Sequence, residues 1–194
     1  MAKIGLFYGS STGNTETAAY QIKEKLEALD GIDAVEVHNI GASSPEQILG
    51  YQYLVMGIPT WNTGELQDDW AFFFPKLSGM NFSGKKVALF GLGDQNGYGF
   101  NFLDAMGVLG DELLVQGADL TGYWTTRTYD FAESLATDGG DFFMGLGLDN
   151  DGQADMTEAN SAFNRPRAVC SRRLTVPTGQ ANSSPISLRD RPSK

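Results

Sequence analysis

The sequence of 194 residues contains one cysteine, Cys170, and one histidine, His38. A single cysteine excludes a disulfide within the chain, and the two residues together leave no Cys and His set for a zinc site. No apolar run approaches the roughly 20 residues that cross a bilayer, and the first residues lack a basic leader followed by a long apolar stretch. We therefore expect a cytoplasmic protein with no membrane insertion.

Basic residues are also scarce over most of the chain. Residues 1–160 carry 7 Lys and Arg against 23 Asp and Glu, whereas residues 161–194 carry 7 Lys and Arg and a single acid, Asp190. The acidic body argues against binding to nucleic acid or to an anionic membrane, and it favours docking to basic protein partners. An ordinary solvated acidic surface explains the same composition.

Apolar segments alternate with amphipathic helical patterns along the first two thirds of the chain. This alternation predicts a single α/β domain, in which helices cover both faces of a parallel sheet. The predicted strands are residues 3–9, 34–38, 51–57, 86–93 and 118–124. The predicted helices are residues 15–29, 45–49, 66–74 and 101–114.

Two stretches interrupt this pattern. Residues 125–141 are polar and contain glycine, and an apolar run resumes at residues 142–148, which predicts an insertion that splits the last strand. From about Ser161 the composition changes to Arg, Pro, Ser and Asn. We therefore expect a domain of residues 1–158, followed by a basic tail of residues 159–194 that is mostly disordered. A frameshift or altered gene end explains the tail, and so does a natural extension.

The turn between the first strand and the first helix has the sequence Ser10-Ser11-Thr12-Gly13-Asn14-Thr15. Backbone N–H groups, hydroxyls and the positive end of a helix can hold a phosphate in such a turn. No Lys or Arg occurs between Lys3 and Lys23 to hold an anion by charge. The turn therefore suits the phosphate monoester of a cofactor better than the triphosphate of a nucleotide hydrolase, which would need a Gly-Lys-Ser/Thr motif.

Two further loops follow the third and fourth predicted strands, and each contains one large aromatic residue, Trp61 or Tyr98. Ligands of open parallel sheets bind beyond the carboxyl ends of the strands, so these loops should converge on the phosphate turn. Core packing is the ordinary role of either aromatic alone, but together they predict a slot for a flat aromatic cofactor. Asp94 fits a turn residue and cofactor contact better than a catalytic acid. Ser10 and Ser11 are candidate nucleophiles, but the one histidine, His38, is placed in another predicted strand, which argues against a hydrolase triad.

Three motifs resemble the flavodoxin family: Ser-x-Thr-Gly-Asn-Thr at 10–15, Pro-Thr-Trp-Asn-x-Gly-Glu-Leu-Gln at 59–67 and Gly-Asp-Gln-x-Gly-Tyr at 93–98. Gly-Tyr-Trp at 122–124 and Gly-Leu-Gly-Leu-Asp-x-Asp at 145–151 resemble the long-chain branch of cyanobacteria and algae. The resemblance covers roughly residues 2–158. It implies a flavodoxin-like three-layer α/β fold, with a five-stranded parallel sheet of order 2-1-3-4-5 whose last strand is split by the insertion.

The resemblance also implies non-covalently bound FMN. Its phosphate would be bound by Ser10, Ser11, Thr12, Gly13, Asn14 and Thr15, although related sequences often have Lys where Asn14 stands. Trp61 and Tyr98 would sandwich the isoalloxazine ring. The remaining contacts would come from Pro59, Thr60, Asn62, Thr63, Gly64, Gly93, Asp94 and Asn101, with Asp151 at the edge of the ring.

The function implied is a monomeric, low-potential one-electron carrier rather than an enzyme. Its partners would be basic redox proteins, such as photosystem I, ferredoxin-NADP reductase and a nitrogenase reductase system. The alternatives are an FMN-dependent NAD(P)H:quinone reductase-like enzyme, and a folding-impaired flavodoxin that cannot hold FMN. We consider a folding-impaired flavodoxin because long-chain flavodoxins finish with an amphipathic helix, whereas no apolar helical stripe follows Glu158 in this sequence.

Overall fold

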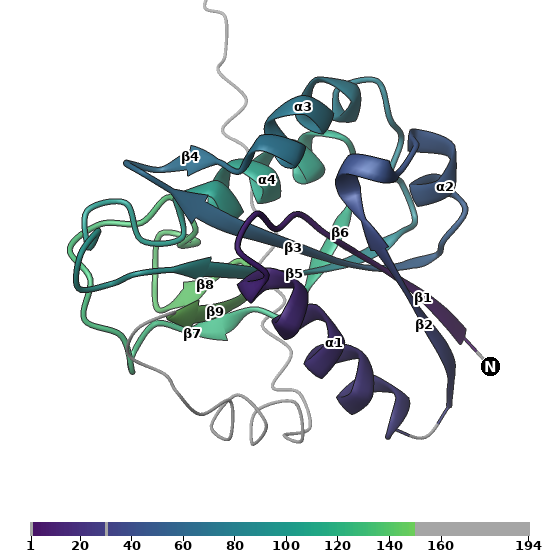
Figure 1. Cartoon of the computed structure of the whole chain (residues 1–194), viewed down its shortest axis with the longest axis horizontal. Coiled ribbons are helices and arrows are strands. Elements are labelled where there is room, and N and C mark those ends of the chain that lie inside the picture. Colours follow the sequence, from purple (N-terminus) through teal and green to yellow (C-terminus); the bar gives the residue numbers. More distant parts are fainter. Residues whose placement is uncertain (1, 30, 150–194) are drawn as a thin grey trace, which may run out of the picture.

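The computed structural model describes residues 2–29 and 31–149, and its centre is a parallel sheet (Figure 1). The strands follow the order β2-β1-β3-β5-β6, and β9 also pairs with β5. Their bounds are β1 Ala2–Tyr8, β2 Ile32–Asn39, β3 Tyr53–Trp61, β5 Lys86–Gly93, β6 Asp119–Thr121 and β9 Leu146–Asp149. With β6 and β9 counted as one split strand, this is the predicted order 2-1-3-4-5.

The insertion lies between the two halves of the last strand. β6 pairs with Lys86–Ala88 at the start of β5, and β9 pairs with Phe90–Gly93 at its end. Between them, β7 (Trp124–Thr125) and β8 (Phe142–Phe143) form a separate antiparallel pair. The predicted strand 118–124 was therefore too long, because Gly122 adopts a φ of 81° and the chain leaves the central sheet after Thr121.

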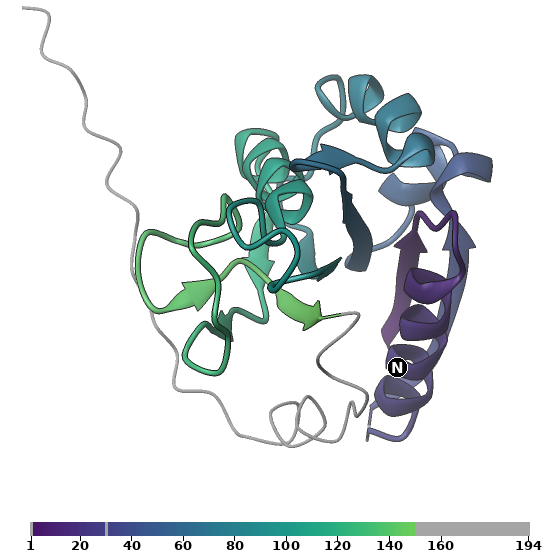
Figure 2. The ribbon, with the colours of Figure 1, turned by 60° about the vertical axis from the view of Figure 1, so that its left-hand side comes forward.

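Helices cover both faces of the sheet, as Figures 1 and 2 show. α1 (Asn14–Glu27) packs Ala18, Ile22 and Leu26 onto one face, against a cluster that includes Phe90. The other face carries η1 (Ile40–Ala42), α2 (Pro45–Leu49), α3 (Asp68–Leu77) and α4 (Asp104–Val115). The strands of such a sheet are apolar on both sides, which explains why they appear in the sequence as continuous apolar runs.

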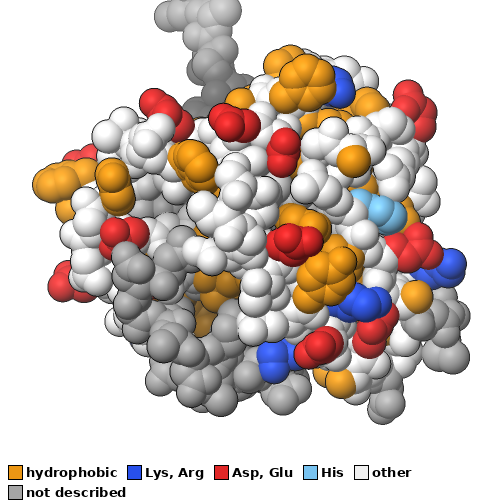
Figure 3. Space-filling view, viewed as in Figure 1, with side chains coloured by type: hydrophobic (Ala, Val, Ile, Leu, Met, Phe, Trp, Pro, Cys, Tyr) orange, Lys and Arg blue, Asp and Glu red, His pale blue; other side chains and the backbone are white. Residues whose placement is uncertain are grey.

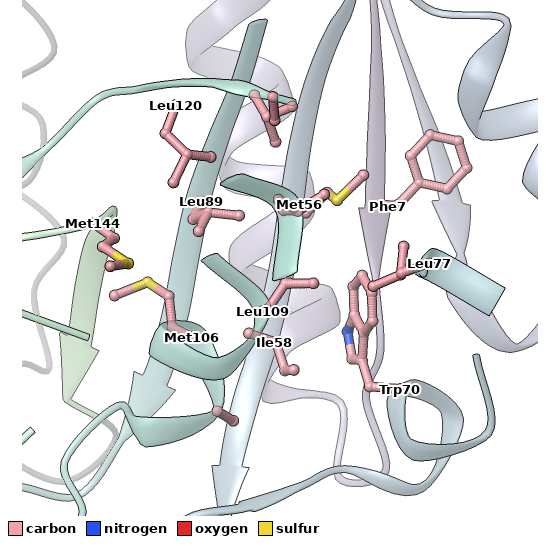
Figure 4. Close-up of a cluster of buried hydrophobic side chains, with 14 of the residues drawn as sticks. Phe7, Met56, Ile58, Trp70, Leu77, Leu89, Met106, Leu109, Leu120 and Met144 are labelled. Carbon is pink, nitrogen blue, oxygen red and sulfur yellow. The ribbon is translucent and has the colours of Figure 1, made fainter. Parts of the chain in front are cut away.

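The core under α3 and α4 fixes the ends of the central strands (Figure 4). Trp70 of α3 is fully buried, and its Nε1 donates to the carbonyl oxygen of Gly57 over 2.8 Å. Leu109 of α4 belongs to the same cluster as Ile58 and Leu89 of β3 and β5. This packing holds the carboxyl ends of β1, β3 and β5 at one edge of the molecule.

Three predicted boundaries were wrong near that edge. β3 continues to Trp61 instead of ending at residue 57, because Thr60 and Trp61 pair with β4 (Glu65–Leu66) in a hairpin. α3 begins at Asp68, with Gln67 as its cap, and α4 begins only at Asp104, because Leu103 has a left-handed φ of 62°. The predicted domain boundary at residue 158 and the tail of residues 159–194 lie outside the described residues.

Across residues 2–29 and 31–149, no helix is both long enough and apolar enough to cross a membrane.

Candidate functional site

A cavity of about 280 Å³ lies beyond the carboxyl ends of β1, β3 and β5. Its walls come from three segments that are far apart in the sequence: the turn after β1, the hairpin of β3 and β4, and the loop after β5. The lining residues are Thr12, Asn14, Thr60, Trp61, Asn62, Gly93, Asp94, Tyr98 and Asn101. Each of these was named from the sequence, so the structure brings together the predicted core of the site.

The other predicted residues lie beside this lining. Ser10, Ser11, Gly13 and Thr15 belong to the turn after β1 and the start of α1, whereas Pro59, Thr63 and Gly64 belong to the hairpin. Pro59 is buried within β3, and it was wrong to place it in a loop. Asp151 lies outside the described residues.

The turn after β1 presents hydrogen-bond donors. Gly13 has a φ of 88°, and its N–H donates to Oγ of Ser10 over 3.0 Å. No side chain caps α1, so the N–H groups of its first turn have no side-chain acceptor at the cap. The acidic residue of that turn, Glu16, accepts a hydrogen bond of 2.7 Å from the hydroxyl of Tyr8, and burial raises the pKa of Tyr8 above its usual range. The turn is therefore suited to an anion such as a phosphate.

The hairpin places Trp61 at the cavity through a tight loop of residues 62–64. Asn62 has a φ of 46°, a left-handed conformation that costs a non-glycine residue roughly 1 kcal/mol or more. Its side-chain Nδ2 donates to Oε2 of Glu65 over 2.6 Å. Oγ1 of Thr60 accepts a bond of 3.2 Å from the N–H of Ala105, which joins the hairpin to the start of α4.

The loop after β5 is ordered by Asp94. Its Oδ1 accepts from the N–H groups of Asn96 and Gly97 over 2.9 and 2.7 Å, and its carbonyl oxygen accepts from the N–H of Tyr98 over 3.0 Å. Asp94 is thus a turn residue that also lines the cavity, as expected. Tyr98 is 50% exposed, so its ring is free to cover a ligand.

Three buried polar residues around the site were missed by sequence reasoning. They are Gln67, Asp104 and Asp149, with exposed fractions of 2%, 5% and 3%. Gln67 contacts Ser11 of the turn after β1, and Asp104 accepts from Nδ2 of Asn101 over 2.9 Å. Gln67 ends the motif of residues 59–67 and Asp149 lies in the motif of residues 145–151, which were the available signals, but burial of a polar side chain is decided by tertiary contacts.

The insertion also reaches the site, which the sequence did not indicate. The N–H groups of Ala132 and Glu133 donate to the carbonyl oxygen of Gly99, next to Tyr98. Gln95 accepts from the N–H of Asp130 and donates to Oδ2 of Asp149, with both bonds 2.7 Å long. The insertion therefore braces the loop that carries Tyr98.

Charge is distributed unevenly around the cavity. The segments 9–14, 59–67 and 93–104 contain Glu65, Asp94 and Asp104 but no Lys or Arg. On the face shown in Figure 3, the left-hand edge, where β3 and β4 end in Figure 1, carries red acidic side chains and no blue ones. Lys3, Lys23 and Lys86 instead pair with Glu36, Glu27 and Asp119, away from the cavity.

A family model for flavodoxin matches residues 6–163 of this sequence. The chain belongs to the flavodoxin family. It is 49% identical to a flavodoxin of Trichodesmium erythraeum over 159 residues, which cover 81% of this chain and 91% of that protein. It is 47% identical to a flavodoxin of Synechocystis sp. over 158 residues, which cover 81% and 91%. The resemblance to cyanobacterial flavodoxins is therefore confirmed.

Solved structures agree with this assignment. The flavodoxin of Fusobacterium nucleatum bound to flavin mononucleotide has a TM-score of 0.76 and 28% sequence identity, covering 84% of this chain and 94% of that one. Its mutant K13G bound to the same cofactor also has a TM-score of 0.76, at 29% identity, covering 84% and 92%. The predicted flavodoxin-like fold is confirmed.

As a flavodoxin, the protein is an FMN-based electron carrier. The cavity has the donor set that this cofactor requires, because two aromatic rings flank it while hydroxyl and amide groups reach it from the turn after β1 and the hairpin. The individual roles assigned to these residues stay predictions.

Proposed function

We propose that this flavodoxin is a low-potential, one-electron carrier of the cytoplasm that passes electrons between larger redox proteins and has no enzymatic activity of its own. The observation that carries the proposal is the segregation of charge. Asp94 lines the cavity and Glu65 lies on the hairpin beside it, whereas the described lysines lie elsewhere on the domain or are paired with acids. A partner with a basic surface is therefore drawn to the cofactor end of the molecule.

Bound FMN supplies a ring that accepts and releases electrons. The hairpin of this chain holds the Asn62–Thr63 peptide at its tip, in a loop that already contains a left-handed residue and Gly64 with a φ of 94°. We infer that the carbonyl oxygen of this peptide would accept a hydrogen bond from a ring N–H that exists only after reduction. Each 1.4 kcal/mol of that hydrogen bond shifts a one-electron potential by about 59 mV.

The acidic surroundings lower the reduction potential. Asp94 in the cavity wall and Glu65 on the hairpin would repel added negative charge on the bound ring, and the partly apolar slot between Trp61 and Tyr98 would solvate that charge poorly. Full reduction is therefore more costly than it is for flavin in water, which is the property that a low-potential carrier needs.

The proposed partners are photosystem I, ferredoxin-NADP reductase and a nitrogenase reductase system, each docking through a basic surface to the monomeric protein. Two exposed aromatic side chains support an apolar centre for such a contact, namely Tyr98 at 50% and Phe100 at 71% exposure. Acidic side chains around an apolar centre are typical of a transient interface that forms rapidly and separates rapidly.

The test is the rate of electron transfer from the reduced protein to ferredoxin-NADP reductase at increasing ionic strength. We expect the rate constant to fall steeply between low and physiological salt, because screening weakens attraction between exposed charges. Asp68→Lys, beside the hairpin, should slow transfer at low salt more than Glu24→Lys near the far end of α1. Rates that are indifferent to salt, or equal effects of the two variants, would contradict docking at this end.

A further inference from the structure

Gln67 is a buried amide that joins two walls of the site. It is 2% exposed and lies between the hairpin and α3, whose N-terminus it caps. Its Nε2 donates to Oγ of Ser11 over 3.0 Å and to Oδ2 of Asp69 over 3.1 Å. Its Oε1 accepts from the N–H of Trp70 over 3.4 Å. Every hydrogen-bonding atom of this side chain therefore has a partner.

These partners fix which end of the amide faces Ser11. The N–H of Trp70 can only donate, so it requires Oε1, while the carboxylate of Asp69 accepts and so requires Nε2. Gly9 permits the close approach, because a Cβ at that position would lie 2.4 Å from Oε1 of Gln67. Only an N–H donor is therefore presented to Ser11.

The bond from Gln67 determines how the Ser11 hydroxyl is used in hydrogen bonding. Because Ser11 Oγ accepts from Gln67, its own hydrogen is left to donate elsewhere. Ser10 shows the same arrangement, since its Oγ accepts from the N–H of Gly13. Each of these two hydroxyls thus has one accepting position occupied and its hydrogen available to donate, in a segment from residue 4 to residue 22 that contains no Lys or Arg.

We propose that Gln67 is a positioning residue that sets Ser11 as a donor to the phosphate of FMN and so gives the site its preference for FMN over riboflavin. The proposal rests on the FMN-binding function stated above. Riboflavin carries the same ring system without the phosphate, so a residue that acts through the phosphate changes the ratio of the two affinities. A residue that only stabilises the fold changes both affinities together.

The experiment titrates the flavin-free full-length chain with FMN and with riboflavin and follows the flavin fluorescence. Gln67→Met keeps the side-chain length but removes the donor. We expect its affinity for FMN to fall about tenfold or more, whereas its affinity for riboflavin changes less than about threefold. Ser11→Ala, an exposed position, should give the same loss of preference, and Gln67→Met should add little to it in the double variant.

Gln67→Glu removes the N–H donor to Ser11 but keeps the oxygen that caps α3. A carboxylate still accepts from the N–H of Trp70, but it also takes the hydrogen of Ser11 and leaves the phosphate without it. We expect at least as great a loss of preference as in Gln67→Met. Because the new negative charge also repels the phosphate, Ser11→Ala decides the matter if the methionine variant fails to fold. Gln116→Met is the matched control, because Gln116 is a part-buried amide that bonds to Glu112 at the end of α4.

An unchanged ratio of FMN to riboflavin affinity in both Gln67 variants would overturn the proposal, as would additive losses in the double variant. A wild-type chain that binds neither flavin would instead overturn FMN binding itself. The two failures are therefore distinguishable.

Discussion

The backbone N–H of Leu135 donates to Oδ1 of Asp104 over 2.7 Å, although the two residues are 31 positions apart. Asp104 begins α4, and Leu135 belongs to the insertion that splits the last strand. The second oxygen of the same carboxylate accepts from Nδ2 of Asn101, which lines the cavity. One buried side chain thus connects the insertion to the cofactor site.

Asp104→Asn should destabilise the protein by about 1–3 kcal/mol, because the amide nitrogen replaces one acceptor and sets a donor against a buried donor. Urea unfolding of the FMN-loaded protein measures the change. Asp111→Asn, at an exposed position of the same helix, is the control and should change stability by less than about 0.5 kcal/mol. Equal stability of the two variants would show that the bonds of Asp104 contribute nothing net.

Trp61→Ala and Tyr98→Ala should each weaken FMN binding by about 1 kcal/mol or more, because each loses stacking on the isoalloxazine ring. Titration of the flavin-free protein measures both affinities. Phe72→Ala, which removes a ring that is 71% exposed on α3, should leave the affinity unchanged. A purified chain that is colourless and takes up no FMN would refute the binding site altogether.

Replacement of residues 159–194 by an amphipathic helix should raise the melting temperature. Within the described residues α1 lies over β1, β2 and β3 on its face of the sheet (Figure 2). Phe90, Leu92, Leu146 and Leu148 belong to the same apolar cluster as the buried side chains of α1. A helix that packs several apolar side chains there contributes roughly 1.5 to 3 kcal/mol for each one. FMN should raise both melting temperatures, because it binds the folded form. Equal melting temperatures would show that the native residues 159–194 already supply this packing.

Glu27 should contribute to stability only above acidic pH. The hydrogen bond of 2.6 Å from Lys23, and a second of 3.0 Å from the N–H of Val35, lower the pKa of this carboxyl below its usual value. Because the pKa of Glu27 is lower in the folded state, its contribution to the stability of the fold is complete above the unfolded pKa, near 4.5. This contribution is lost as the pH falls through the pKa of the folded state.

The difference in stability between the wild type and Glu27→Gln, measured by urea unfolding, should therefore be largest at neutral pH and shrink below about pH 4.5. Glu24→Gln, on the same helix, controls for the loss of one negative charge. A difference that is constant from pH 7 to pH 3 would show that the ionised form of Glu27 has no special role.

Apolar runs of strand length and helical periodicity determined the α/β class, and they placed the turn of residues 10–15 and the loops with Trp61 and Tyr98 at the ends of strands. The strand order and the other residues that line the cavity were implied by the motifs that resemble the flavodoxin family. Motifs that follow neighbouring parallel strands must meet at one edge of the sheet, so no knowledge of packing was needed to bring Thr12, Trp61 and Tyr98 together.

Tertiary structure alone decided how those residues are held. β3 continues to Trp61 because it pairs with β4. α4 starts at Asp104 because the backbone turns at Leu103. The burial of Gln67 and Asp104 beside the site is equally invisible in the sequence, because a polar side chain is stable in the interior only when distant partners satisfy it. Such partners, Ser11 for Gln67 and Leu135 for Asp104, are brought within reach only by the folded chain.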